Sequence, residues 1–147
     1  MYSTSTFFLS VFYCFSRSEL QGQTILSGVH NTFTPVTAID QPNNQVTVGS
    51  TSGFFPGDTF LIIQHQGADI NTTNSSAFGD VTNYNSAGLN EVNVIESVSG
   101  NDVQLRFTMT NSYQVAGGVQ MVDVPNYQNV QLSANLASPS WNGSVGG

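Results

Sequence analysis

The chain consists of short stretches in which apolar and polar residues alternate, interrupted at close intervals by glycine, proline and asparagine. Gln45–Val48, for example, alternates with period two, as a half-buried β-strand does. No segment sustains the 3.6-residue apolar period of an amphipathic helix. Short strands separated by turns are typical of small barrels and sandwiches. The sequence therefore predicts an all-β fold with almost no helix, arranged as a small antiparallel β-barrel or sandwich.

Two segments are the most specific strand predictions. Asp58–Gln66 contains the consecutive apolar residues Phe60–Ile63, so we expect a central strand that is buried on both faces. Glu91–Val98 and Asp102–Thr108 flank a glycine and an asparagine that tolerate the positive φ of a tight turn, and these segments predict a hairpin. Its apolar face is expected to comprise Val92, Val94 and Val98, with Glu96 as an exception, opposite Val103, Leu105 and Phe107. Further strands are expected at Val119–Val124 and Val130–Leu136.

A long polar segment, residues 67–88, separates the central strand from the hairpin and is rich in Asn, Thr and Ser. Connections of this length are unusual in compact domains. We expect this one to be either functional or loosely ordered.

Charge is scarce and strongly one-sided. Charged residues make up 7% of the chain, lysine is absent, and Arg17 and Arg106 face nine acidic residues, for a net charge of -7. So few basic groups cannot displace counterions from nucleic-acid phosphates or dock on anionic lipid. Hydrophobic residues, at 39%, are still numerous enough to form a core. The composition thus excludes nucleic acid as a partner and favours a folded module.

The N-terminus carries an apolar run, Phe7–Phe15, of the length found in export signals. It is shorter than the roughly 20 residues of a transmembrane helix. We expect residues 1–23 to be a signal peptide, which places the mature chain outside the cell or on its surface with no membrane span. The flanking charges differ from the usual pattern, because no basic residue precedes the run, so a buried strand or short helix is the alternative. Cys14 lies inside this run, which leaves the mature chain without cysteine and without a disulfide.

Four segments carry a family resemblance, in order along the chain: Phe54–Ala68, Ala87–Glu91, Gly118–Tyr127 and Ser138–Gly147. Together they resemble the N-terminal region of large, adhesin-like secreted surface proteins of Bacteroidetes-type bacteria. Many of these proteins carry gliding-motility-associated or secretion-sorting C-terminal domains. The resemblance supplies no catalytic residues.

The last of these segments, with its W-x-G-x-x-G-G pattern, is typically followed by more chain in such proteins. The resemblance therefore implies a β-barrel or sandwich domain over residues 24–125. Residues 126–147 would be the truncated start of a following β-rich, solenoid-like region. Gly146 and Gly147 permit the close backbone approach expected at the first rung of a β-solenoid.

Catalytic patterns are largely missing from the sequence. The histidines of the mature chain, His30 and His65, lie far apart, and His65 is expected to pack or bond a neighbour rather than bind zinc. A Ser-His-Asp triad can be built from distant residues, but no G-x-S-x-G element is present. Carboxylates such as Asp58 and Glu91 are expected to cap turns or face solvent rather than form a hydrolytic pair. We expect a protein that is not an enzyme.

Calcium is the ion that the sequence could accommodate. Asp69, Asn71, Asn74 and Asp80 fall in the long polar segment and offer the oxygen ligands that calcium prefers. Their spacing does not match an EF-hand loop, and a solvated loop without metal is the alternative. No other cofactor is expected.

Exposed aromatic side chains could provide a platform for sugar rings. Tyr84 and Trp141 are the ligand-binding candidates, with Tyr113 and Tyr127 as further aromatic residues of the same kind. The alternative is that these rings are core residues whose polar atoms are satisfied, as is common for Trp and Tyr.

The sequence favours a non-catalytic structural or adhesive module of an exported bacterial cell-surface protein. The alternative is a carbohydrate-binding or accessory module of a secreted polysaccharide-active enzyme. The expected partners are other domains of the same longer chain and extracellular polysaccharide.

Overall fold

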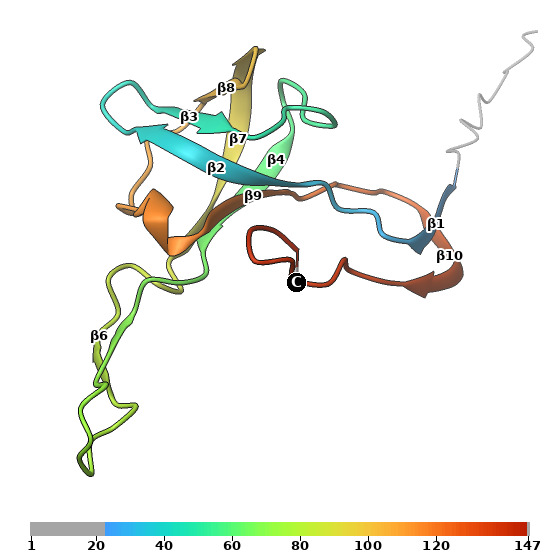
Figure 1. The fold of residues 1–147 in the computed structure, drawn as a ribbon. Coiled ribbons are helices and arrows are strands. Elements are labelled where there is room, and N and C mark those ends of the chain that lie inside the picture. The colour runs from blue at the N-terminus through green and yellow to red at the C-terminus, as the bar shows by residue number, and fades with distance from the viewer. Residues whose placement is uncertain (1–22, 147) are drawn as a thin grey trace, which may run out of the picture.

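The computed structural model describes residues 23–146, and within them the protein is all-β (Figure 1). The strands are β1 (Thr24–Gly28), β2 (Phe33–Asp40), β3 (Gln45–Val48), β4 (Thr59–Gln64), β5 (Asp69–Ile70), β6 (Val81–Asn83), β7 (Asn90–Ser99), β8 (Asp102–Leu105), β9 (Val119–Asp123) and β10 (Val130–Leu136). A single 3-10 turn, η1 (Val115–Gly117), is the helical element of the described chain. The expected signal peptide lies outside the described residues except for Gln23, and Cys14 lies outside them too.

Six strands close into a barrel in the order β2-β3-β8-β7-β4-β9, and every neighbouring pair is antiparallel. This confirms the predicted small antiparallel barrel. Closure removes the open edges that a flat sheet of six short strands would present. None of the helical structure in the described part of the chain is long and apolar enough to cross a membrane.

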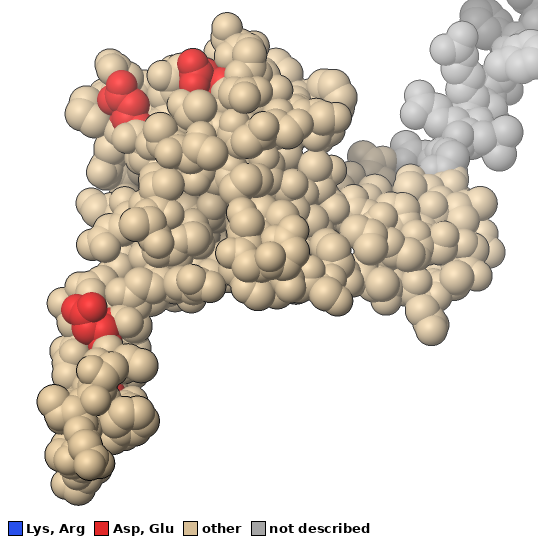
Figure 2. All heavy atoms as spheres, in the orientation of Figure 1, with Lys and Arg blue, Asp and Glu red and all other residues tan. Residues whose placement is uncertain are grey.

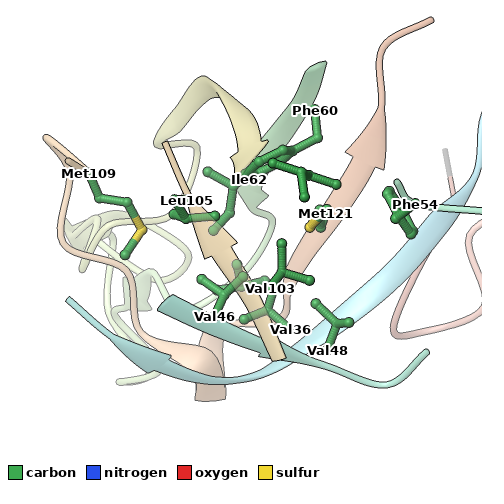
Figure 3. Close-up of a cluster of buried hydrophobic side chains, with 12 residues drawn as sticks. Val36, Val46, Val48, Phe54, Phe60, Ile62, Val103, Leu105, Met109 and Met121 are labelled. Atoms are coloured by element: carbon green, nitrogen blue, oxygen red, sulfur yellow. The ribbon is translucent and has the colours of Figure 1, made fainter. Parts of the chain in front are cut away.

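The barrel interior is a solid apolar core. Alternate residues of each strand point inward, as the two-residue period of a β-strand requires. The labelled side chains in Figure 3 point toward one another from different strands and from the loop that carries Phe54. The core comprises Val36, Val46, Val48, Phe54, Phe60, Ile62, Ile95, Val103, Leu105, Met109, Val119 and Met121. Because side chains fill the lumen, binding sites are expected on the outside.

Strand β4 is central, as predicted, and lies between β7 and β9. Phe60 and Ile62 are fully buried inside the barrel, whereas Leu61 and Ile63 are half-buried on its outer face. The outer face of β4 and β9 is covered in part by the C-terminal segment, which explains why β4 is apolar on both sides.

The hairpin of β7 and β8 is confirmed, with Gly100 at a φ of 60° in its turn. The predicted face of β7 is wrong. Asn93 and Ile95 point into the barrel, whereas Val92 lies outside and is 61% exposed. A β-bulge between Ile95 and Ser97 then shifts the alternation by one residue, so that Val98 packs against the core.

Phe107 was expected to continue the apolar face of the partner strand, and this prediction is also wrong. Strand β8 ends at Leu105, and the Phe107 side chain is exposed. The side chain of Asn93 ends the pairing, because its Nδ2 donates to the Phe107 carbonyl at 2.8 Å and its Oδ1 accepts the Phe107 N–H at 3.1 Å.

The long polar segment forms a narrow arm that projects from the barrel (Figure 1). Its two short strands, β5 and β6, pair antiparallel, and all their residues are exposed. Asn71 shapes the tip, since its Oδ1 accepts the Thr73 N–H at 2.9 Å and its own N–H donates to the Asp80 carbonyl at 2.8 Å. The segment therefore owes its form to turns and local hydrogen bonds rather than to a core.

Strands β1 and β10 form a separate two-stranded parallel sheet beside the barrel (Figure 1). Every residue of β10 is exposed, and Leu26 is the buried residue of β1. The last barrel strand, β9, ends at Asp123, and β10 pairs with β1 rather than with a barrel strand. The division into residues 24–125 and 126–147 stays a prediction.

Candidate functional site

The chain after β10 returns to the barrel and docks on the outer face of β9 through Gln120. The buried Gln120 Nε2 donates to the Gly146 carbonyl at 3.3 Å, and the Gly146 N–H donates to Gln120 Oε1 at 3.0 Å. The side-chain amide thus offers the same donor and acceptor that a neighbouring strand would offer. This double hydrogen bond fixes the C-terminal segment on the barrel.

The docked segment is a compact loop with its own internal order. Asn142 Oδ1 accepts the N–H groups of Ser144 and Val145, both at 2.9 Å. Gly146 has a φ of 109°, and a Cβ at this position would lie 2.7 Å from the Ser140 carbonyl oxygen. The loop therefore requires glycine where its chain closes against Gln120.

Trp141 projects from this loop onto His65, the residue that follows β4. The two ring centroids lie 4.8 Å apart with the planes tilted by 48°. His65 Nε2 is buried and has no hydrogen-bond partner in the described structure. Burial lowers the pKa of His65, so the imidazole is uncharged near neutral pH.

Beneath Trp141 lies a cavity of about 390 Å³, here named the Trp141 cavity. Its lining comprises Phe33, Leu61, Ile63, His65, Gln120, Val122, Trp141 and Gly146. Its volume falls within the roughly 300–1,000 Å³ of small-molecule sites. None of these residues is charged at neutral pH. The Gln120 amide is already bonded to Gly146, so His65 Nε2 is the buried polar atom left for a ligand.

A second hollow of about 500 Å³ contains the carboxylates of Asp58 and Asp123. Asp58 Oδ2 accepts the Phe55 N–H at 2.7 Å, which is the turn-capping role expected for this residue. Burial and the nearby charge of Asp58 both raise the pKa of Asp123. No basic side chain lines this hollow.

The two aromatic candidates of the sequence prediction have different surroundings. Trp141 is 38% exposed and has His65 as its ring partner. Tyr84 follows β6 and is 69% exposed. The Tyr84 ring is absent from the lining of the Trp141 cavity. Of the two, the structure places only Trp141 at a hollow in the described surface.

The four candidate calcium ligands all lie in the arm. Asp69 Oδ2 already accepts a hydrogen bond from Asn85 Nδ2 at 2.7 Å, and Asn71 Oδ1 accepts two from Thr73. Asn74 and Asp80 are exposed. Within residues 23–146, no three His, Cys, Asp or Glu side chains gather where they could hold a metal. Calcium binding, which relied here on two carboxylates and two amides, stays a prediction.

Sequence reasoning missed the two glutamines that organise this side of the barrel. Gln64 is fully buried, its Nε2 donates to the carbonyls of Gln66 and Asn85, and its Oε1 accepts the Gln114 N–H at 2.7 Å. It thereby connects β4 to the arm and to η1. A Cβ on Gly117 would overlap the Gln64 amide, so these two residues fit together only with glycine at 117. A glutamine in the most apolar strand was the available signal.

Comparison with known proteins gives little beyond the fold. No protein-family profile and no curated protein matches the chain. One solved structure is similar over 74% of this chain: the Gp54 tailspike of the Acinetobacter baumannii bacteriophage AP22, in complex with A. baumannii capsular saccharide. The identity is 18% and the TM-score 0.48, and the match spans 17% of the tailspike chain.

Proposed function

We propose that this chain is a non-catalytic structural and adhesive module of an exported bacterial cell-surface protein. The observation that carries the proposal is the solid core, because it leaves the lumen no room for a substrate. Binding capacity then belongs to the outer surface, where the Trp141 cavity and the projecting arm lie. That surface carries little charge in Figure 2, in keeping with contacts made by uncharged groups.

The adhesive role is tested with beads coated with the full exported chain under flow. We expect retention on films of neutral polysaccharide, with chitin and cellulose as the two test films, above that of albumin-coated beads. The same films are assayed for released reducing ends, and we expect none. Retention no better than albumin would contradict adhesion, and released reducing ends would contradict the non-catalytic assignment.

Export is tested by the N-terminus of the protein recovered from the producing cell. A mature chain that begins at about Thr24 and is recovered outside the cytoplasm supports the proposed compartment. A recovered chain that still begins at Met1 contradicts it.

The Trp141 cavity also favours a second candidate, a carbohydrate-binding or accessory module of a secreted polysaccharide-active enzyme. An aromatic ring beside an uncharged hollow suits sugar as well in an enzyme accessory module as in an adhesin. The sequence of the full open reading frame separates the two. Adhesin-like repeats and a sorting domain would support the first, and a hydrolase or lyase domain would support the second.

A further inference from the structure

We propose that the Trp141 cavity binds one neutral, N-acetylated sugar unit of a surface polysaccharide. The proposal rests on the adhesive function proposed above and names the ligand class of that function. Three properties of the cavity carry it: its lack of charge, its aliphatic floor, and the single unpaired polar atom in its wall.

The charge of the cavity selects a neutral ligand. No lining residue is charged at neutral pH, so a cationic sugar would lose its hydration without gaining a carboxylate partner. The chain has a net charge of -7, which repels anionic polysaccharides. Among sugars, this leaves uncharged ones.

The floor of the cavity selects an apolar substituent. Leu61, Ile63 and Val122 present aliphatic side chains on the outer faces of β4 and β9. A hydroxyl placed against them would lose its hydrogen bonds to water without replacement, whereas a methyl group would not. An acetyl methyl group meets this requirement.

The wall of the cavity selects a hydrogen-bond donor next to that methyl group. An uncharged imidazole has one protonated nitrogen and one acceptor, and His65 Nε2 is buried without a partner. The N–H of an acetamido group would satisfy this acceptor while its methyl group lies on the floor. Trp141, which is partly exposed at the rim, offers its ring to the apolar C–H face of the sugar.

The test uses Trp141 itself, since it is the only tryptophan in the chain. The full chain is titrated with triacetylchitotriose and, as the probe without acetamido groups, with cellotriose. We expect a saturable change of Trp141 fluorescence with triacetylchitotriose and none with cellotriose over the same range. No saturable change with triacetylchitotriose, or an equal change with both sugars, would overturn the proposal.

The variant His65→Phe keeps a ring against Trp141 but removes the acceptor. We expect it to weaken triacetylchitotriose binding by about 5- to 10-fold, the value of one hydrogen bond. The matched control His30→Phe alters the histidine near β1 and should bind like the original chain. Unchanged binding by a folded His65→Phe variant would overturn the proposal. If that variant does not fold, the comparison of the two sugars still decides.

Two further outcomes separate this proposal from the function on which it rests. Beads that adhere equally well with and without His65→Phe, while triacetylchitotriose fails to bind, would leave adhesion standing and overturn the cavity assignment. A neutral acetylated peptide with an apolar side chain that binds more tightly than triacetylchitotriose would identify a protein partner and also overturn it.

Discussion

At the scale of single residues, buried amides connect the parts of the molecule. Gln64 and Gln120 are both nearly inaccessible, and each spends its side-chain donor and acceptor on backbone groups of other segments. A buried amide is costly unless every bond is made, so each of these residues fixes the position of the segments that it contacts.

The variant Gln64→Leu keeps the volume of the side chain but removes its three hydrogen bonds. The Gln114 N–H would then be buried without a partner, and we expect the free energy of unfolding to fall by about 2–4 kcal/mol. Urea denaturation measures the change. The matched control Gln66→Leu alters an exposed side chain and should change stability by less than about 0.5 kcal/mol. Equal effects of the two variants would refute this role of Gln64.

The docking of Trp141 should depend on pH through His65. Burial lowers the pKa of His65 in the folded chain, so between that value and about 6.5 the unfolded chain binds more protons. Stability from the Trp141 contact is therefore complete above about pH 6.5 and is lost as the pH falls below it. We expect Trp141 emission to shift to the red on acidification. The shift should be absent in His65→Phe, and its persistence there would contradict this account.

At the scale of elements, the β-bulge in β7 and the arm show two ways in which local sequence departs from a regular pattern. The bulge reverses the alternation within one strand and so lets both Ile95 and Val98 reach the core. The arm, by contrast, adds two strands that contribute nothing to the core, because all their residues are exposed.

The barrel should therefore tolerate a shortened arm. Ile70 pairs with Val81, so an Asn-Gly turn can replace residues 71–80 and close the hairpin between them. We expect the free energy of unfolding to change by less than about 1 kcal/mol, because loop length has a weak effect on closure entropy. Thermal unfolding followed by circular dichroism measures it. Loss of a cooperative transition would show that the arm supports the barrel.

The same shortened variant tests the calcium prediction, since it lacks Asn71, Asn74 and Asp80. If the arm binds calcium, the added ion raises the melting temperature of the original chain only, and a chelator reverses the effect. Identical melting temperatures with calcium and with chelator in the original chain would rule out the site.

At the scale of the whole molecule, attractive ion pairs contribute little. The ion pair of the described residues joins Arg106 and Glu96 at 2.7 Å, and both side chains are about half exposed. The remaining acidic groups repel one another across the surface. The stability of this protein thus comes from the apolar core and from hydrogen bonds.

This balance predicts the response to salt. Raising NaCl from about 10 mM to about 150 mM shortens the Debye length and screens the repulsion. We expect the melting temperature to rise by roughly 1–3 °C, a change of less than about 1 kcal/mol. The variant Arg106→Gln removes the ion pair and should show the same or a larger rise. A melting temperature that falls with salt would show that attractive pairs dominate.

The parallel pairing of β1 and β10 is a further property of the whole molecule. The two strands contain no charged residue and no proline, and they leave Ile25 and Leu132 about 60% exposed. Isolated parallel pairs of this kind are weakly stable, because parallel sheets normally have both faces covered. Sequence reasoning identified Val130–Leu136 as a strand, but its partner lies 106 residues earlier at Thr24 and follows from no local pattern.

By itself, the sequence determined the all-β class, the central position of β4, the β7–β8 hairpin and the scarcity of charge, because alternation and turn residues act locally. The tertiary structure alone decided the inward face of β7, since a bulge moves every later side chain to the other face. It alone brought His65 and Trp141 together, 76 positions apart, through the Gln120–Gly146 hydrogen bonds. Contacts between distant segments depend on the whole fold, so the candidate site emerged only with it.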